Sequence, residues 1–321
     1  MKKLKIIIIF LLLFQGCKST QSSFNYEKLL WTTDWSPNKE LIVVGGNWDT
    51  LQILSANDLE VVKSYKIPRT ITKTAWHNSG EIIAVTSQIS KDVAVLIDTK
   101  TDKITKLEHV HEHGARGLSW NSDGSLLAIG DNSGHLTLFD SEGNFIKKKD
   151  LEQKAITGLS WHPTKNTVVA VGSQISIYDV DKDELKTMIP REIEILMLSA
   201  AWHPSGEFFV TGDYGDFEKD YPPLLQFWSQ TGNNIKNIEE SKAEYRNLKW
   251  TSDGKTLASA SEKIRLWNTD GELLKSRSLG NSLLWGIDWN SDNNKIVVTN
   301  ENGDIKILNQ NLKIVLEKEN N

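Results

Sequence analysis

Tryptophan and arginine occupy four of seven equivalent positions in this chain of 321 residues. Each position lies four residues before a member of a regularly spaced tryptophan series, and the seven residues are Trp31, Thr72, Arg116, Thr157, Leu198, Arg246 and Trp285. Trp and Arg are the types most enriched at protein-interaction hot spots, where they combine a large contact area with directional polar groups. The pattern therefore favours recognition of a polypeptide. The alternative is that Trp31 and Trp285 only fill the core.

A second set of candidate contact residues lies in the segment GDYGDFEKDYPPL, at 212–224. Tyr214, Phe217 and Tyr221 alternate with acidic side chains, and two consecutive prolines stiffen the end of the segment. Long loops on a rigid scaffold are common binding elements, so we expect these aromatic residues to contact a partner. Two alternatives stay open. The loop folds onto its own repeat, or its carboxylates bind calcium, although their spacing matches no EF-hand.

Three histidines alternate along the segment HVHEHGAR, at His109, His111 and His113. On an extended strand these imidazoles share one face, as zinc ligands can. No carboxylate or fourth histidine is obviously paired with them, so a solvated loop is the favoured interpretation. We predict no metal site here.

Catalytic motifs are absent from the sequence. It contains no Gly-x-Ser-x-Gly elbow, phosphate loop, HExxH motif or carboxylate pair with interpretable spacing. We therefore predict no catalytic residues and no cofactor. His77, His162 and His203 each follow a repeat tryptophan directly, which indicates a common structural role in a turn.

The elements that carry these residues repeat about every forty positions. The repeat tryptophans are Trp35, Trp76, Trp120, Trp161, Trp202, Trp250 and Trp289, at intervals of 41, 44, 41, 41, 48 and 39 residues. In the third repeat the pattern predicts an inner strand at 116–120, a turn at 121–124, and strands at 126–130, 135–140 and 144–150. A period near forty with four strands per repeat is typical of a propeller blade.

These residues resemble the WD40-repeat family of β-propellers over positions 28–317. The third strands end in degenerate forms of the Trp-Asp signature, such as LID (96–98), LFD (138–140), IYD (177–179) and LWN (266–268). The resemblance implies an all-β fold of seven four-stranded antiparallel blades. Most blades lack the Gly-His element, so we expect the family's buried Asp-His-Ser-Trp network to be missing from most of them. LKIVLEK (312–318) serves as the last outer strand, so we expect seven blades that are each contiguous in sequence. The alternative is that FNYEKLL (24–30) closes the ring as an outer strand.

Family resemblance also implies where partners dock. In WD40 proteins partners commonly bind the face that carries the entrances of the inner strands. Arg246, Trp285 and Trp31 would then lie on adjoining blades six, seven and one, with Trp48 in a nearby loop. The alternative function is an enzyme or a small-ligand or metal binder that uses the central channel, as in propeller lactonases and lyases. Its only acidic candidates beside the repeat tryptophans are Asp34 and Asp288, next to Lys249.

The first residues resemble a bacterial lipoprotein signal. A basic start precedes nine apolar residues at 6–14, too short at about 14 Å to cross a bilayer core of about 30 Å. The only cysteine, Cys17, follows directly after Gly16. Phe14 and Gln15 depart from the usual residues at their positions. An ordinary signal peptide that happens to contain a cysteine is the alternative. We expect a signal peptide at 1–16, a lipidated Cys17 with a flexible tether at 17–27, and the propeller at 28–321.

Charge and composition limit the partners. The net charge of −5 shows no basic footprint for nucleic acid. If Cys17 is acylated, no thiol remains, which excludes disulfides, zinc thiolates and cysteine nucleophiles. We expect a monomeric propeller that binds an unknown protein or peptide and is held to a membrane by its N-terminal lipid. It would face the periplasm from the outer membrane of a Gram-negative cell, or lie on the outer leaflet of a Gram-positive one. An envelope propeller of the TolB type is a further possibility.

Overall fold

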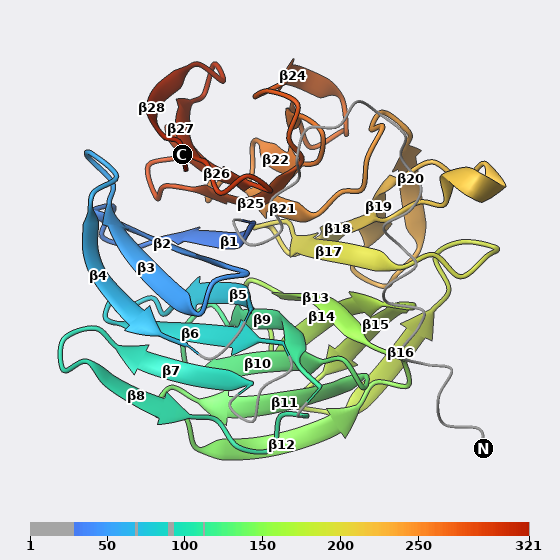
Figure 1. The fold of residues 1–321 in the computed structure, drawn as a ribbon. Helices are drawn as coiled ribbons and strands as arrows, with labels where there is room; N and C mark the ends of the chain where they lie inside the picture. The colour runs from blue at the N-terminus through green and yellow to red at the C-terminus, as the bar shows by residue number, and fades with distance from the viewer. Residues whose placement is uncertain (1–28, 68–69, 89–92, 112, 321) are drawn as a thin grey trace, which may run out of the picture.

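Seven small sheets surround a central axis in the computed structural model, which describes residues 29–67, 70–88, 93–111 and 113–320. Each sheet contains four consecutive antiparallel strands. Figure 1 shows the first strand of every sheet near the middle of the ring and the fourth at its edge. This arrangement confirms the predicted all-β, seven-bladed propeller. No helix among the described residues is long and apolar enough to cross a membrane.

Every innermost strand ends at a repeat tryptophan. These strands are β1 (Leu30–Trp35), β5 (Ile71–Trp76), β9 (Ala115–Trp120), β13 (Ile156–Trp161), β17 (Met197–Trp202), β21 (Asn247–Trp250) and β25 (Leu284–Trp289). The second strands are β2 (Leu41–Gly46), β6 (Ile82–Ser87), β10 (Leu126–Asp131), β14 (Thr167–Gly172), β18 (Phe208–Asp213), β22 (Leu257–Ala260) and β26 (Lys295–Asn300). The strand boundaries predicted in the third repeat agree with the structure to within one residue.

The outer half of each blade completes the sheet. The third strands are β3 (Thr50–Ser55), β7 (Ala94–Asp98), β11 (His135–Asp140), β15 (Ile175–Asp179), β19 (Leu225–Ser229), β23 (Ile264–Trp267) and β27 (Ile305–Asn309). The fourth strands are β4 (Val61–Lys66), β8 (Lys103–Lys106), β12 (Phe145–Asp150), β16 (Glu184–Met188), β20 (Asn234–Ile238), β24 (Leu273–Arg277) and β28 (Ile314–Lys318). A 3₁₀ turn, η3 (Phe217–Lys219), lies between β18 and β19.

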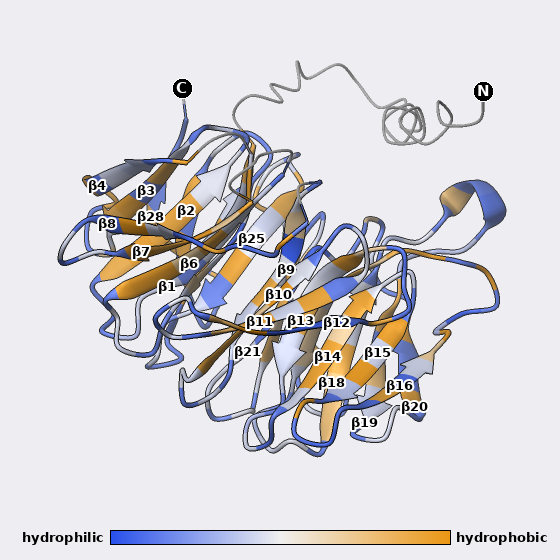
Figure 2. Cartoon of the chain, turned by 90° about the horizontal axis from the view of Figure 1, so that it is seen from below, coloured by the Kyte–Doolittle hydropathy of each residue, from blue (hydrophilic) through white to orange (hydrophobic). Residues whose placement is uncertain are grey.

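Burial falls from the inner strands to the outer ones. Five of the six residues of β14 are buried, because neighbouring blades cover both faces of the strand. All five residues of β24 are exposed at the rim. Figure 2 shows the same division, with apolar stretches along the strands and polar turns at both faces of the ring. The core therefore lies between blades, as the predicted alternation requires.

Repeat tryptophans are the wedges between blades. Trp161 is 6% exposed, and its indole Nε1 donates to the Ser119 carbonyl of the preceding blade at 3.0 Å. Trp289 makes the equivalent bond to the Lys249 carbonyl at 3.2 Å. These two wedges thus tie their own blade to the neighbouring blade by packing and by one directional bond.

The three histidines that follow repeat tryptophans connect neighbouring turns, which confirms their structural role. His77 Nε2 lies 3.0 Å from the Gly124 carbonyl of the next blade, and its ring contacts Trp120 edge-on. His162 and His203 make the same contact with the next blade's turn, at 3.1 and 2.9 Å. Gly124 has a φ of 77°, and a Cβ there would lie 2.3 Å from His77 Nε2, so the turn requires glycine.

Only parts of the family's buried polar network are present in the described blades. In blade five, Trp228 Nε1 donates to Thr211 Oγ1 at 2.9 Å. In blade six, Trp267 Nε1 donates to Ser259 Oγ at 2.9 Å. In other blades, clusters of aliphatic side chains stand in place of these hydrogen bonds. One such cluster packs Val43 against Ile83 between blades one and two. Packing between sheets thus holds most blade pairs together.

Ring closure joins blade seven to blade one without any exchange of strands among the described residues. Asp288 Oδ2 accepts the Trp35 backbone N–H at 2.7 Å, and Thr299 Oγ1 donates to the Leu30 carbonyl at 3.2 Å. At the rim, Lys318 Nζ donates to the Leu59 carbonyl at 2.9 Å. The expected seven contiguous blades are therefore confirmed, and side-chain bonds replace a shared strand at the seam.

Candidate functional site

All seven residues that precede the repeat tryptophans by four positions meet at one mouth of the central channel. Six of them are the second residue of an innermost strand, and Arg246 directly precedes β21. The inner strands run in the same direction from this face, so equivalent positions reach the same depth around the axis. Together with Lys73 and Asn247, the seven residues line a hollow of about 50 Å³.

Two tryptophans and two arginines form a stack across this mouth. The ring centroids of Trp31 and Trp285 lie 4.7 Å apart, with planes at 53°. The Arg246 guanidinium carbon lies 3.4 Å from the Trp285 ring centroid, and that of Arg116 lies 4.8 Å from the Trp31 centroid. We call Arg116, Trp31, Trp285 and Arg246 the mouth quartet. Cation–π contact favours this order, because each guanidinium faces an aromatic ring.

The quartet is fixed by contacts with its surroundings. Trp31 is half-buried and donates its indole N–H to Asn47 Oδ1 at 2.6 Å. Arg246 pairs with the Glu244 carboxylate. Arg116 faces Gln88, and with the Gln88 amide oxygen turned toward it the N···O distances are 2.6 and 2.8 Å. These restraints hold the four groups ready for contact and reduce the entropy lost on binding.

The two tryptophans differ in burial, and each one fits a different interpretation. Trp285 is only 7% exposed, as the core-filling interpretation expects. Trp31, Arg116 and Arg246 are each partly exposed and keep surface at the hollow. Blades six, seven and one contribute neighbouring side chains, whereas Arg116 reaches across from blade three. This crossing was not foreseen from the sequence. The role of the four residues in binding stays a prediction.

Below the quartet, Lys73 and Asn247 continue the polar surface. Lys73 Nζ donates to Asn247 Oδ1, and the Asn247 amide donates to the Trp285 carbonyl at 2.5 Å. Burial, together with the nearby charge of Lys249, lowers the Lys73 pKa to about 8. Burial likewise lowers the Arg246 pKa to about 9, and the charge of Arg116 adds to the effect. Lys73 was not among the predicted site residues, although the position of a charged lysine within the inner strand β5 marks it in the sequence.

Deeper in the channel, one lysine lies between two carboxylates. Lys249 Nζ is 2.9 Å from Asp288 Oδ1 and 3.8 Å from Asp34 Oδ1. Asp34 Oδ2 also accepts the Trp76 backbone N–H at 2.5 Å, the same kind of bond that Asp288 makes to Trp35. Burial and the charge of Asp288 raise the Asp34 pKa. Both carboxylates thus have structural partners already, which is a thin basis for the alternative of a channel metal site or enzyme.

No group of three or more potential ligands is placed to hold a metal ion in the part of the chain that the structure describes. His109 does not join the other two alternating histidines, since its ring packs on Phe145 with centroids 4.3 Å apart. His111 and His113 contact each other at 4.6 Å. The described residues of this segment, between β8 and β9, form no strand. The three imidazoles therefore do not share one face.

The insertion of blade five opens on the same face as the mouth, since it follows the end of β18 that pairs with the start of β17. Tyr214 is half-buried and close enough to Arg246 to affect its pKa. Phe217 is 60% exposed at η3. Tyr221 lies under Arg191, whose guanidinium carbon is 5.1 Å from the ring centroid. The structure thus places Tyr214 beside the quartet, Tyr221 in the base of the loop and Phe217 at its tip.

The base of the insertion is an ion pair. Arg191 Nη1 donates to Asp213 Oδ2 at 3.1 Å and to the Pro222 carbonyl at 2.8 Å. Asp213 is fully buried and also accepts the Leu224 backbone N–H at 2.8 Å. This anchoring partly supports the alternative of a loop that folds onto its own blade, yet it leaves Phe217 free of the core.

Trp48 lies apart from the mouth quartet. It is half-buried in the loop after β2 and packs on the apolar cluster between blades seven and one, which includes Leu30 and Ile305. It is not among the residues that line the hollow. The predicted position of Trp48 in a nearby loop of blade one agrees with the structure, since the adjacent Asn47 bonds to Trp31, and a contact of Trp48 with a partner stays a prediction. A large apolar indole in a loop is stabilised when it packs on a nearby apolar surface and is removed from water.

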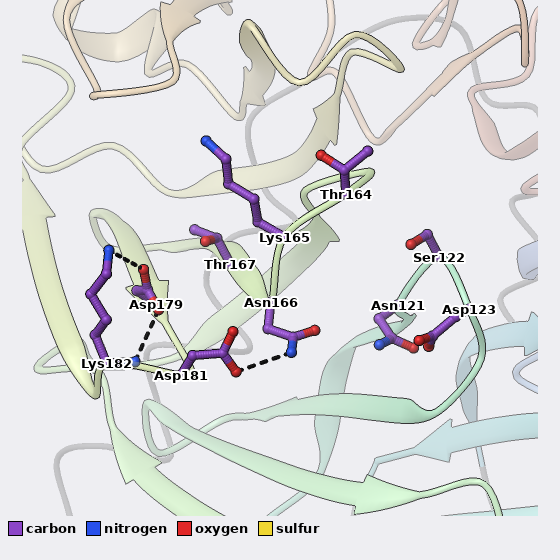
Figure 3. A pocket seen from close by; sticks show the side chains of 10 residues that line it. All are labelled: Asn121, Ser122, Asp123, Thr164, Lys165, Asn166, Thr167, Asp179, Asp181 and Lys182. Carbon is purple, nitrogen blue, oxygen red and sulfur yellow. Dashed lines mark hydrogen bonds and ion pairs between the residues drawn. The ribbon is translucent and has the colours of Figure 1, made fainter.

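A larger hollow of about 480 Å³ lies on the opposite face, between the turns of blades three and four. Figure 3 shows its polar lining, in which Lys182 pairs with Asp179 and Asn166 donates to Asp181. Lys165 also lies at this hollow. The lining carries three aspartates and two lysines, and none of the residues predicted to bind partners takes part.

Cys17 and the predicted boundaries at 16 and 27 lie outside the described residues. The anchor, the signal peptide and the location of the protein thus remain predictions from the sequence.

Known proteins of similar sequence are WD-repeat proteins and related factors. Residues 82–164 match a family model described as the anaphase-promoting complex subunit 4 WD40 domain, and residues 132–285 match one described as eukaryotic translation initiation factor eIF2A. WD repeat-containing protein srw1 of Schizosaccharomyces pombe is 21% identical over 243 residues, covering 73% of this chain and 42% of srw1.

Two further relatives show the same level of similarity. The putative BTB/POZ domain and WD-repeat protein R61 of Acanthamoeba polyphaga mimivirus is 21% identical over 287 residues, which cover 81% of this chain and 55% of that protein. Eukaryotic translation initiation factor 3 subunit I of Candida glabrata is 19% identical over 202 residues, 57% of this chain and 58% of that protein. The chain spans about half the length of these relatives. Its blades and its tryptophan period are those of a seven-bladed β-propeller, and these matches support the WD40-repeat family.

Proposed function

We propose that this propeller is a protein-interaction platform and that its contact site is the channel mouth. One observation carries the proposal: the mouth quartet brings two tryptophans and two arginines into a single stack. Such residues dominate binding energy at interfaces when they cluster in a well-packed centre. The partly exposed Tyr214 extends this surface toward the insertion, whose tip carries Phe217.

Similarity to WD-repeat proteins supports a role in protein interaction. Two of the matched descriptions name subunits, one of the anaphase-promoting complex and one of translation initiation factor 3. A rigid ring that presents many loops on one face suits such a role, because loops vary without loss of the scaffold. A scaffold without catalysis is the function that we propose here.

A pull-down from the native envelope tests the contact site. The wild-type chain is compared with a Trp31→Ala/Trp285→Ala variant, after circular dichroism has established that both are folded. Phe145→Ala is the matched control, since Phe145 is an aromatic residue 45% exposed on the outer strand β12. We expect a partner to be lost with the double variant and kept with the control. An unchanged set of partners in the double variant would refute the site.

We also propose that the chain is anchored in the bacterial cell envelope through acylated Cys17. Support comes from the apolar run at 6–14 and the cysteine that follows it. Two or more acyl chains are sufficient for stable anchoring. Mass spectrometry of the N-terminal peptide should detect the acyl mass on Cys17, and Cys17→Ser should release the protein into the soluble fraction. An unmodified Cys17 on an exported chain would instead indicate an ordinary signal peptide.

A further inference from the structure

We infer that residues 216–221 of the blade-five insertion form a docking knob, which places Phe217 in an apolar pocket of a protein partner with basic residues at the rim of that pocket. The inference rests on the proposed function, since it takes the chain to be a protein-interaction platform, but it concerns a contact separate from the mouth quartet.

Phe217 is the most exposed aromatic side chain of the described residues, at 60%. It lies in η3, which contains no buried residue, and the segment around η3 stands out beyond the blades in both views (Figure 1 and Figure 2). A ring on such a convex element is removed from water only when it enters a concavity of another molecule, and that burial is favourable. Single exposed apolar residues are common on protein surfaces, so exposure alone does not mark a site.

Backbone contacts hold the docking knob in one shape. The Asp216 N–H donates to the Tyr221 carbonyl at 2.6 Å, and the Tyr221 N–H donates back to the Asp216 carbonyl at 2.9 Å. Asp220 closes η3 with a φ of 62°, which is uncommon for a residue other than glycine. Gly215, at the entrance, has a φ of 69°, and a Cβ there would lie 2.7 Å from the backbone across the loop. This fixed turn presents Phe217 with little ordering left to occur on binding.

The base of the docking knob is held by groups that find their partners within the propeller. Arg191 joins the buried Asp213 carboxylate to the Pro222 carbonyl, and its guanidinium covers the Tyr221 ring. None of these contacts involves the Phe217 ring. The anchored base thus leaves that ring available to a partner.

Charge on the docking knob is negative. Asp216 pairs with Lys219 at 2.8 Å, whereas Glu218 and Asp220 are exposed and form no ion pair with any described residue. Three carboxylates and one ammonium group give this short turn a net charge of −2. Interfaces place opposite charges around a buried centre, and such charges attract the partner and set its orientation. The pocket that accepts Phe217 therefore has basic groups at its rim.

Other occupants fit the docking knob less well. A second copy of this chain offers at the mouth a hollow of about 50 Å³, whereas an apolar cavity of about 150 Å³ is what holds a benzene ring in a protein core. The larger hollow on the opposite face has a polar lining. An anionic lipid surface would repel Glu218 and Asp220. A different protein is the occupant that both the apolar ring and the charge favour.

A photoreactive side chain at position 217 identifies the pocket. Benzoylphenylalanine replaces Phe217 in the full-length chain in its native cells, and the same replacement at Phe145, 45% exposed on β12, is the matched control. After irradiation, mass spectrometry maps the cross-linked residue of the partner. We expect a protein that cross-links from position 217 but not from position 145, at an apolar pocket with Lys or Arg at its rim.

Calorimetry with that purified protein measures the two parts of the contact. Phe217→Ala should weaken binding at least 10-fold, as truncation of an interface hot spot does. Glu218→Gln/Asp220→Asn should weaken binding and reduce its dependence on salt. Glu60→Gln/Glu184→Gln, which removes the same charge from exposed positions of other blades, should change neither property. The charge variants decide the matter if circular dichroism shows that Phe217→Ala does not fold.

The opposite outcomes overturn the inference. A pocket without basic residues, or wild-type affinity of Phe217→Ala or of Glu218→Gln/Asp220→Asn, contradicts the assigned chemistry. Cross-links mainly to lipid or to a second copy assign the docking knob to another occupant, and the absence of any cross-link specific to position 217 leaves it without one. The mouth is judged separately, because the Trp31→Ala/Trp285→Ala pull-down decides the proposed contact site in each of these cases.

Discussion

Replacement of Asp288 tests how the ring is closed. The seam between blades seven and one is the one place where no loop connects neighbouring blades in the described ring. Asp288 is 3% exposed, and its Oδ2 accepts the Trp35 backbone N–H across the seam at 2.7 Å. The substitution Asp288→Ala removes this acceptor and leaves a buried backbone donor without its partner.

A hydrogen bond to a charged group contributes about 1.5–3 kcal/mol to the free energy of unfolding. Asp288 also lies 2.9 Å from Lys249 Nζ, but the Lys249 side chain is 48% exposed. Solvent screens such a pair, so it contributes about 0–1 kcal/mol. We therefore expect Asp288→Ala to lower the free energy of unfolding by about 1.5–4 kcal/mol.

Ser160 provides the matched control. Its Oγ accepts the Trp202 backbone N–H at 2.9 Å between blades four and five, which the chain connects directly. This bond has a neutral acceptor, so Ser160→Ala should cost about 0.5–1.5 kcal/mol. The control removes the same type of bond at a seam that cannot separate freely.

Urea denaturation followed by tryptophan fluorescence gives the free energies, and hydrogen exchange shows where the ring opens. Asp288→Ala should increase amide exchange first in β1 and β25, which face each other across the seam, whereas Ser160→Ala should not. Equal stability losses in the two variants, or faster exchange in blades three to five alone, would refute the role of Asp288 in closure.

Three further predictions concern the channel, the turns and the insertion. Between pH 8 and 10.5 the unfolded chain binds more protons at Lys73 than the folded one, so stability should rise with pH there, and Lys73→Met should remove this rise in denaturation curves. His162→Ala should cost about 1–2 kcal/mol, since it loses the Gly206 contact. Burial lowers the His162 pKa, so the wild type should also lose stability as pH falls below 6.5, and the variant should not. Arg191→Met should cost about 3–5 kcal/mol and speed chymotrypsin cleavage at Phe217, and unchanged proteolysis would contradict the anchoring of the loop.

The tryptophan period predicted the fold because each repeat is one sheet that must pack on its neighbours. A residue at a fixed distance from Trp120 or Trp161 therefore occupies the same height in every blade. This relation also brought the seven entrance positions to one mouth, from Trp31 to Trp285. Regular spacing carries such information, since it depends on strand geometry and not on individual side chains.

Contacts across the axis could not be predicted in the same way. Arg116 reaches Trp31 from blade three, and this contact depends on side-chain length and rotamer. Lys73 was missed because its role arises only when Asn247, 174 positions later, lies beside it. Trp48 lies in the nearby loop that was predicted, but its packing on the apolar seam depends on the path of that loop. The spacing of residues in the sequence gives no information on these three contacts.

Both ends of the described chain leave the propeller at the mouth face. β1 begins beside Trp31, and the end of β28 pairs with the start of β27, where Asn320 also binds Asp304. A domain or tag fused at either end would therefore be held at high effective concentration beside the quartet and would compete with partners in solution. In the proposed anchored form, the eleven residues between Cys17 and Leu29 extend at most about 40 Å. The start of β1 at the mouth face would then stay within that distance of the bilayer, within reach of partners held at the membrane surface.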